Sequence, residues 1–219
     1  MDYINIHTHT FNIEPETVQL LNVFPEEQDK LQLPCYFSVG LHPWYVKEDT
    51  WKHEVEIVRS ASSLPSVLAI GETGLDRTVS VPMQAQQAAF EEQLHLAESS
   101  RKAVVIHCVR SYSEILAYRK KSDLSIPWIF HWFNSNEQTA RELVRKNCYL
   151  SFGHMLFNEQ SKAYHVFKNM PAEYIFLETD DAGYSIQQVY EQATLLRNFH
   201  PGVLKSQILD NFARCFNIT

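Results

Sequence analysis

The chain has 219 residues, of which 45% are hydrophobic and 21% are charged, an ordinary balance for a globular protein. Its formal net charge of −7 counts against a broad, non-specific nucleic-acid groove, which needs a basic surface. No apolar run is long enough to span a membrane, and the N-terminus lacks the features of a signal peptide. We therefore expect a cytoplasmic protein in which residues 1–219 form a single domain.

Eight short apolar runs recur along the chain, and most are continuous, as in strands that are buried on both faces. We predict strands at 3–7, 18–24, 35–40, 66–71, 103–107, 127–131, 148–153 and 173–178. Helical patterns follow most of these runs, at 49–62, 81–100, 111–122, 136–147, 158–170, 185–199 and 204–216. Strands that alternate with helices predict a parallel sheet, and eight such strands predict an α/β fold, the (β/α)₈ TIM-type barrel.

The interval between the first two predicted strands is too short for a full helix. The total length also falls below the roughly 250 residues typical of this barrel. We therefore expect a shortened barrel whose first helix is missing or reduced to a turn.

Histidines and carboxylates stand at or just after seven of the eight apolar runs: His7 and His9, His42, Glu72, His107, His131, His154 and Asp180. In this type of barrel the active residues lie at the carboxyl ends of the strands, so these side chains are expected to converge. Imidazole and carboxylate ligands suit ions such as zinc or manganese. The ligands are too numerous for one catalytic zinc with an open position, and they suit two divalent ions that share a carboxylate.

Several motifs, in order, carry a resemblance to a known family: "IHTH", "GLHPW", "GETGLD", "QQAAFEEQL", "VVIHCVR", "FHWF", "LSFG", "LETD" and the closing "ILDNFARCF". The chain resembles the TatD family of metal-dependent hydrolases, also called TatD-type deoxyribonucleases. The motifs extend over nearly the whole chain. Family members hydrolyse phosphodiesters, typically removing nucleotides from DNA ends with Mg²⁺ or Mn²⁺.

The resemblance implies two divalent metal ions (zinc, manganese or magnesium), with Glu72 as the carboxylate that bridges them. The first ion would be held by His7, His9 and Asp180, and the second by His107 and His131. A hydroxide held between the ions would attack phosphorus, and Asp180 would orient the attacking water or take its proton. The catalytic residues implied are therefore Asp180 and Glu72, together with His42 near the scissile phosphate.

Two further residues are candidates for substrate contacts. Arg110 lies three residues after His107, and a guanidinium suits the geometry of a phosphate. His154 follows the seventh predicted strand, where it either contacts substrate or packs against its neighbours.

The chain departs from the family pattern at the substrate rim. Asn5 stands where the family usually has an acidic residue, and the basic loop that usually follows "LETD" is absent. The expected substrate is a nucleic-acid end, with a small phosphoester as the alternative; we expect no membrane and no stable protein partner, and a monomer or dimer.

Two other functions therefore stay open: a phosphomonoesterase or amidohydrolase-like enzyme for a small substrate, and a non-catalytic metal-binding scaffold. No lysine in the motifs is placed to form a carbamylated metal bridge, which counts against the amidohydrolase relatives.

Overall fold

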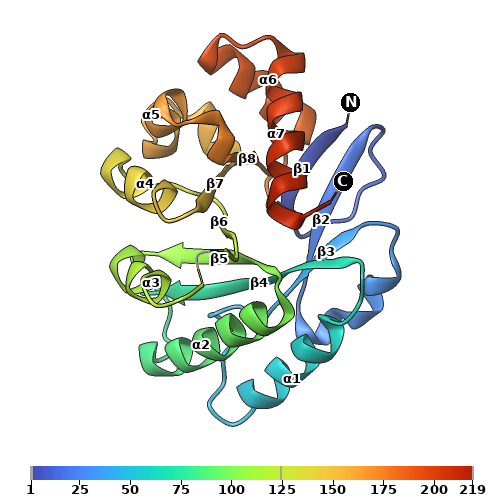
Figure 1. Ribbon diagram of the computed structural model, residues 1–219, viewed down its shortest axis with the longest axis vertical. Coiled ribbons are helices and arrows are strands. Elements are labelled where there is room, and N and C mark those ends of the chain that lie inside the picture. Colours follow the sequence, from blue (N-terminus) through green and yellow to red (C-terminus); the bar gives the residue numbers. More distant parts are fainter. Residues whose placement is uncertain (1, 124, 219) are drawn as a thin grey trace. The chain divides into compact units, whose positions relative to one another are not determined.

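The computed structural model describes residues 2–123 and 125–218 (Figure 1). It contains all eight predicted strands: β1 (Tyr3–Thr8), β2 (Thr17–Val23), β3 (Tyr36–Val39), β4 (Val67–Asp76), β5 (Ala103–Val109), β6 (Trp128–Phe130), β7 (Cys148–Phe152) and β8 (Ile175–Leu177). The strands follow chain order in one sheet. With helices between them, they form the predicted (β/α)₈ TIM-type barrel.

The predicted helices are also present, most of them shorter at their ends than the sequence pattern indicated. They are α1 (Trp51–Ala61), α2 (Met83–Ser100), α3 (Tyr112–Arg119), α4 (Glu137–Val144), α5 (Lys162–Asn169), α6 (Ile186–Arg197) and α7 (Pro201–Phe216). Short 3₁₀ segments are η1 (Pro25–Gln32), η2 (His154–Phe157) and η3 (Ala172–Tyr174). Within the described ranges, none of the helices has the length and apolarity that crossing a lipid bilayer requires.

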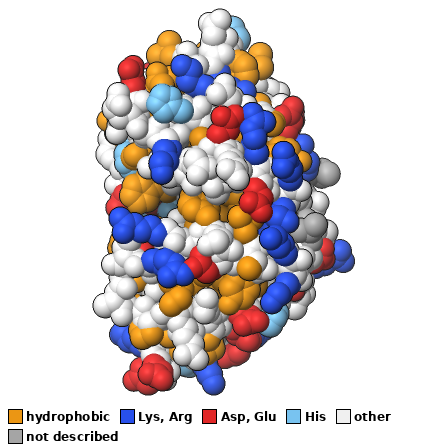
Figure 2. Space-filling model, turned by 90° about the vertical axis from the view of Figure 1, so that its left-hand side faces the viewer, with side chains coloured by type: hydrophobic (Ala, Val, Ile, Leu, Met, Phe, Trp, Pro, Cys, Tyr) orange, Lys and Arg blue, Asp and Glu red, His pale blue; other side chains and the backbone are white. Residues whose placement is uncertain are grey.

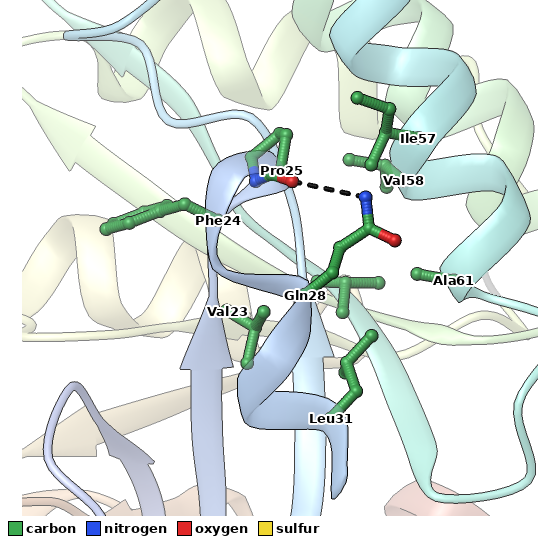
Figure 3. Close-up of a pocket in the computed structure, with 9 residues that line it drawn as sticks. Val23, Phe24, Pro25, Gln28, Leu31, Ile57, Val58 and Ala61 are labelled. Atoms are coloured by element: carbon green, nitrogen blue, oxygen red, sulfur yellow. Dashed lines mark hydrogen bonds between the residues drawn. The ribbon is translucent and has the colours of Figure 1, made fainter.

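The first helix of the barrel is missing, as predicted. Residues 9–16, which join β1 to β2, are all described and contain no helix. The next connection carries only η1, which packs its Leu31 beside Val58 and Ala61 of α1 (Figure 3). The side-chain amide of Gln28 donates to the Pro25 carbonyl at 3.3 Å and closes this short segment.

The chain divides into two compact units. Unit 1 comprises Met1–Leu21 and His131–Thr219, and unit 2 comprises Asn22–Phe130. Each has its own buried apolar core, with Ile6 and Phe176 fully buried in unit 1 and Phe37 and Val105 fully buried in unit 2. The single domain expected from the sequence stays a prediction.

Two strands extend by two residues or more past the ends of the predicted apolar runs. β4 continues past Gly71 to Asp76, and β5 continues past His107 to Val109. Their last residues pair in parallel register, including Asp76 with Val109. Glu72 and His107 therefore lie inside paired strands, where the backbone fixes their direction, and not at the first residue of a loop.

Candidate metal centre

A first cluster of possible metal ligands lies within unit 1. Ligand atoms of His7, His131 and Asp180 lie within 4.8 Å of one another. His7 lies in β1, and the Nε2 atoms of His7 and His9 lie 3.6 and 3.2 Å from the same Asp180 oxygen, Oδ1. His9 follows the end of β1, and the two histidines face the same carboxylate oxygen.

The backbone of unit 1 holds Asp180 in place. Asp180 has a left-handed conformation with a φ of 53°, and its amide donates to the carbonyl of His7 at 3.0 Å. The amide side chain of Asn5 makes two hydrogen bonds to Thr179, at 2.8 and 3.0 Å. Asn5 therefore ties β1 to the residue before Asp180, which is a positioning role at the place where an acidic residue was expected.

Hydrogen bonds also set the charge of Asp180. Burial alone would raise the pKa of this carboxyl, but hydrogen bonds from His7 and His9 outweigh burial and hold the pKa well below its usual value. The carboxylate is therefore ionised at neutral pH. An ionised carboxylate beside buried imidazoles attracts a cation.

A second carboxyl group, that of Glu178, lies next to this cluster. Glu178 is fully buried, and its Oε1 lies 3.9 Å from Nδ1 of His131. The same oxygen accepts a hydrogen bond from the backbone amide of Trp132. Burial raises the pKa of Glu178 to about 8, although the nearby His7 opposes the shift. Glu178 thus supports the segment that carries His131.

The second cluster lies within unit 2 and is more compact. Nδ1 of His107 lies 2.7 Å from Oε1 of Glu72, Nε2 of His42 lies 3.1 Å from the same oxygen, and the two nitrogens are 3.1 Å apart. All three residues are buried, with exposed fractions of 2–4%. Three ligand atoms of three side chains therefore meet at one point.

The local backbone directs Glu72 into this cluster. The pairing of β4 with β5 shifts register between Ile70 and Thr73, a bulge that contains Glu72. The Glu72 amide donates to the side-chain oxygen of Asn22 at 2.6 Å. Gly74 has a φ of 153°, and a Cβ atom there would collide with the backbone of β5, so only glycine permits this close strand pairing.

A network around Asp76 fixes the ring of His107. Nε2 of His107 lies 3.1 Å from Oδ2 of Asp76, which also accepts from the indole of Trp44 at 2.6 Å. Thr78 donates to the other Asp76 oxygen. Burial alone would raise the pKa of Asp76, but these hydrogen bonds hold it well below its usual value.

Both ring nitrogens of His107 face carboxylate oxygens. Such a ring needs two protons, or one proton and a metal ion. Burial alone would lower the pKa of His107, but hydrogen bonds with Asp76 and Glu72 raise it to about 9. A divalent ion at Nδ1 could supply the positive charge that the two carboxylates favour here, in place of a second proton. Asp76 would then orient the ring through Nε2.

The ring of His42 differs from that of His107, because its two nitrogens face one hydrogen-bond donor and one carboxylate. The backbone amide of Trp44 donates to Nδ1 of His42 at 3.2 Å, which leaves the proton of the neutral ring on Nε2. Nε2 faces Glu72, so His42 is satisfied as a donor. This arrangement suits a side chain that donates to Glu72 or to substrate better than it suits a metal ligand.

The donors in both clusters are imidazole nitrogens and carboxylate oxygens, a set that suits zinc or manganese. The paired charges and the convergence of ligand atoms fit divalent ions at both places. The number and identity of the ions stay predictions.

The predicted metal ligands fall into the two clusters, one in each unit. His131 lies with His7 and Asp180, whereas the resemblance assigned it to the other ion beside His107. Which ion it binds, and whether Glu72 bridges two ions, stay predictions. The substrate candidates lie at strand ends: Arg110 is exposed after β5, and the half-buried His154 begins η2. Their roles stay predictions too.

Sequence reasoning missed the supporting roles of Asn5, Asn22, Asp76 and Glu178. Two of them, Asp76 and Glu178, stand inside the quoted motifs, but the partners that reveal their roles are distant in sequence. Gln93, which stands inside the motif "QQAAFEEQL", is a further support. Its side chain bonds the Leu41 amide at 2.8 Å and the Thr73 hydroxyl at 2.7 Å, which joins the loop before His42 to β4.

The family of the chain follows from its sequence. The model of the family described as "TatD related DNase" matches residues 9–217. The chain therefore belongs to the TatD-related DNase family.

Curated relatives carry related names. One is the "3'-5' ssDNA/RNA exonuclease TatD" of Cronobacter turicensis, 34% identical over 67% of this chain and 57% of that protein. Another is an "uncharacterized metal-dependent hydrolase" of Buchnera aphidicola, 28% identical over 83% of this chain and 74% of the relative. For the exonuclease the match thus spans less than two thirds of the relative's length.

Solved structures show the same fold. The TatD homologue YjjV of Escherichia coli aligns with a TM-score of 0.86 at 22% identity, over 99% of this chain and 98% of that chain. A TatD family hydrolase of Entamoeba histolytica aligns with a TM-score of 0.82 at 12% identity, over 100% and 99% of the two chains. At these identities the likeness is one of fold.

Proposed function

We propose that the chain is a divalent-metal-dependent hydrolase that cleaves phosphodiester bonds at nucleic-acid ends. The observation that carries the proposal is the pair of clusters in which imidazole and carboxylate ligand atoms lie within 4.8 Å of one another. They are His7, His131 and Asp180 in unit 1, and Glu72 and His107, with the donor His42 beside them, in unit 2. Family membership and the exonuclease name of a relative support the same reaction. The zinc, manganese or magnesium ions would neutralise charge on the phosphate and lower the pKa of an attacking water.

Residues of the chain supply the remaining chemistry in this proposal. Asp180 is ionised and only 11% exposed in its side chain, so it can orient a water and take its proton. His42 presents an N–H from Nε2 and can donate to a phosphate oxygen. His7, His9 and His131 would hold an ion beside Asp180, and Glu72 with His107 would hold an ion in unit 2.

A nucleic-acid end is the proposed substrate because such a substrate needs few basic contacts. The chain carries a net charge of −7, and Figure 2 shows basic and acidic side chains interspersed over the face in view. A long basic groove would be needed to hold duplex along its length. Bound ions can instead supply positive charge at the scissile phosphate.

The test is release of nucleotides from an end-labelled single-stranded oligonucleotide with Mg²⁺, Mn²⁺ or Zn²⁺, and with chelator. The proposal predicts metal-dependent release that falls by about 10²–10⁴-fold or more in Asp180→Asn, because the base is lost. Asp181→Asn is the matched control, since Asp181 is the exposed neighbour of Asp180. Release that persists in chelator, or equal loss in both variants, would refute the proposed role.

A further inference from the structure

Exposed aromatic side chains gather in one class of connection. Of the large hydrophobic residues that are exposed in the described part of the chain, five are aromatic: Trp44, Tyr45, Trp132, Phe157 and Tyr184. Every one of them lies in a connection from a strand to the helix that follows it. Of the exposed aliphatic residues, Leu64, Leu195 and Val203 lie in helices or before a strand, and Ile13 lies in the loop that joins β1 to β2. The aromatic rings are thus at the strand ends that bear the candidate ligands.

Trp132 is the ring nearest in sequence to a candidate ligand in unit 1. It follows His131 directly, and consecutive Cα atoms are about 3.8 Å apart. Its neighbours are buried: His131 is 7% exposed and Phe133 is 1% exposed, while Trp132 is 41% exposed. The Phe133 amide donates to the Ser151 carbonyl at 2.9 Å, so the segment on which Trp132 stands is anchored.

The backbone of Trp132 is in a conformation that its side chain disfavours. Its φ is 42°, in the left-handed region, where a bulky residue is a genuine outlier and where glycine or asparagine would be less strained. The buried carboxyl group of Glu178 accepts a hydrogen bond from the Trp132 amide and holds this conformation. Such strain clusters at ligand sites. A large ring that is both exposed and strained contributes little to the core, so packing does not account for it.

The Trp132 ring is not stacked on its aromatic neighbour His154. The ring lies 5.6 Å from that of His154 and is inclined to it by 42°. Phe157 and Tyr184 are different, because they stack on each other at 4.3 Å with an interplanar angle of 9°. Nucleobases stack on exposed aromatic rings whatever their sequence.

We propose that Trp132 stacks on a nucleobase that flanks the scissile phosphate and thereby makes the enzyme selective for unpaired nucleic-acid ends. This inference rests on the proposed function. Stacking needs a base that is free of its own duplex neighbours, which a single-stranded end supplies. Trp132 acts in binding and does not touch the reacting atoms.

The test compares two single-stranded oligonucleotides, one with a normal terminal nucleotide and one with an abasic terminal residue. Trp132→Ala is expected to raise KM for the normal oligonucleotide by roughly 5- to 150-fold, the range of base stacking energies, with little change in kcat. The variant should not distinguish the two oligonucleotides, whereas the parent should. Trp132→Phe keeps a ring and should restore most of the difference. Leu195→Ala removes another exposed apolar side chain, on α6, and should behave as the parent.

Equal losses on both oligonucleotides in Trp132→Ala, or loss of bound Mn²⁺ or of kcat, would overturn the inference, because Trp132 would then only position His131.

If the parent cleaves neither oligonucleotide, the proposed function fails, and the inference is tested by oligonucleotide binding instead. Intrinsic tryptophan fluorescence should then be quenched by the normal oligonucleotide alone. Quenching should disappear in Trp132→Phe and persist in Trp51→Phe, a half-buried residue packed near Leu41 and Val46. Equal quenching by the normal and the abasic oligonucleotide would overturn the inference.

Discussion

The clusters of unit 1 and unit 2 use similar ligands but are held in different ways. In unit 2 the side chains of Asn22 and Asp76 fix the cluster, and its ligand atoms lie within 3.1 Å of one another. In unit 1 backbone hydrogen bonds at strand ends fix Asp180, and the side chain of His9 is 27% exposed. A buried hydrogen-bond network makes a cluster rigid, whereas a more exposed cluster is accessible to water and substrate.

We infer from this difference that the two clusters have different roles. We expect the unit 2 cluster to hold its ion tightly, since its ligands are preorganised and their partners are satisfied. We expect the unit 1 cluster to exchange its ion more readily and to lie nearer the attacking water. Variants that disturb one cluster and spare the other test whether the two clusters differ in this way.

The largest effect in this set is expected at His42. If its Nε2 proton serves substrate, His42→Ala should lower kcat by about 10²–10⁴-fold and leave the metal content unchanged. Both quantities are measured on the same preparation, by nucleotide release and by elemental analysis. His53→Ala, on the exposed face of α1, serves as the control. Loss of an ion together with activity would make His42 a ligand and contradict the hydrogen-bonding argument.

A smaller effect is expected at Asp76, which orients His107 without facing the ion. Asp76→Asn should weaken metal binding by about 10–100-fold, the usual cost of losing such a partner. Titration of metal-free protein with Mn²⁺, followed calorimetrically, measures the change. Asp49→Asn replaces an exposed carboxylate of the same unit and should leave both titration steps intact. An unchanged Asp76→Asn titration would show that the network does not stiffen the site.

The smallest effect on activity is expected at Glu178, whose consequence is for stability. Glu178→Ala leaves the amide of Trp132 without its acceptor and should lower the free energy of unfolding by about 1–3 kcal/mol. Glu178→Gln keeps a side-chain oxygen and should cost less. Denaturant unfolding of metal-free protein compares the two. If both variants unfold at the same denaturant concentration, the hydrogen bond to Trp132 is not what Glu178 contributes.

The sequence predicts the strands well because parallel strands buried on both faces are continuous apolar runs. It predicts the absent first helix because the interval between the first two strands, residues 9–16, is too short to hold one. It misjudges β4, which continues to Asp76, because glycines and polar residues in "GETGLD" resemble a turn. The paired segment is revealed only by the register with β5.

The candidate ligands were found because histidine and carboxylate at strand ends form a local pattern. Their supports were not found, because each hydrogen bond joins distant segments. Asp76 meets Trp44, 32 residues earlier, and Asn5 meets Thr179, 174 residues later. Nor does the sequence tell that Trp132 stands exposed in a left-handed conformation, since Phe130 and Phe133 in the same motif are also aromatic but are buried.

The central claim is that each cluster holds its own ion. The most direct measurement is the number of ions per chain, by inductively coupled plasma mass spectrometry after loading with Mn²⁺ and desalting. The account predicts about two ions in the parent and about one in each of Asp180→Asn and His107→Gln, with Asp181→Asn like the parent. A parent that holds one ion, or variants that keep the parent's full number, would contradict it.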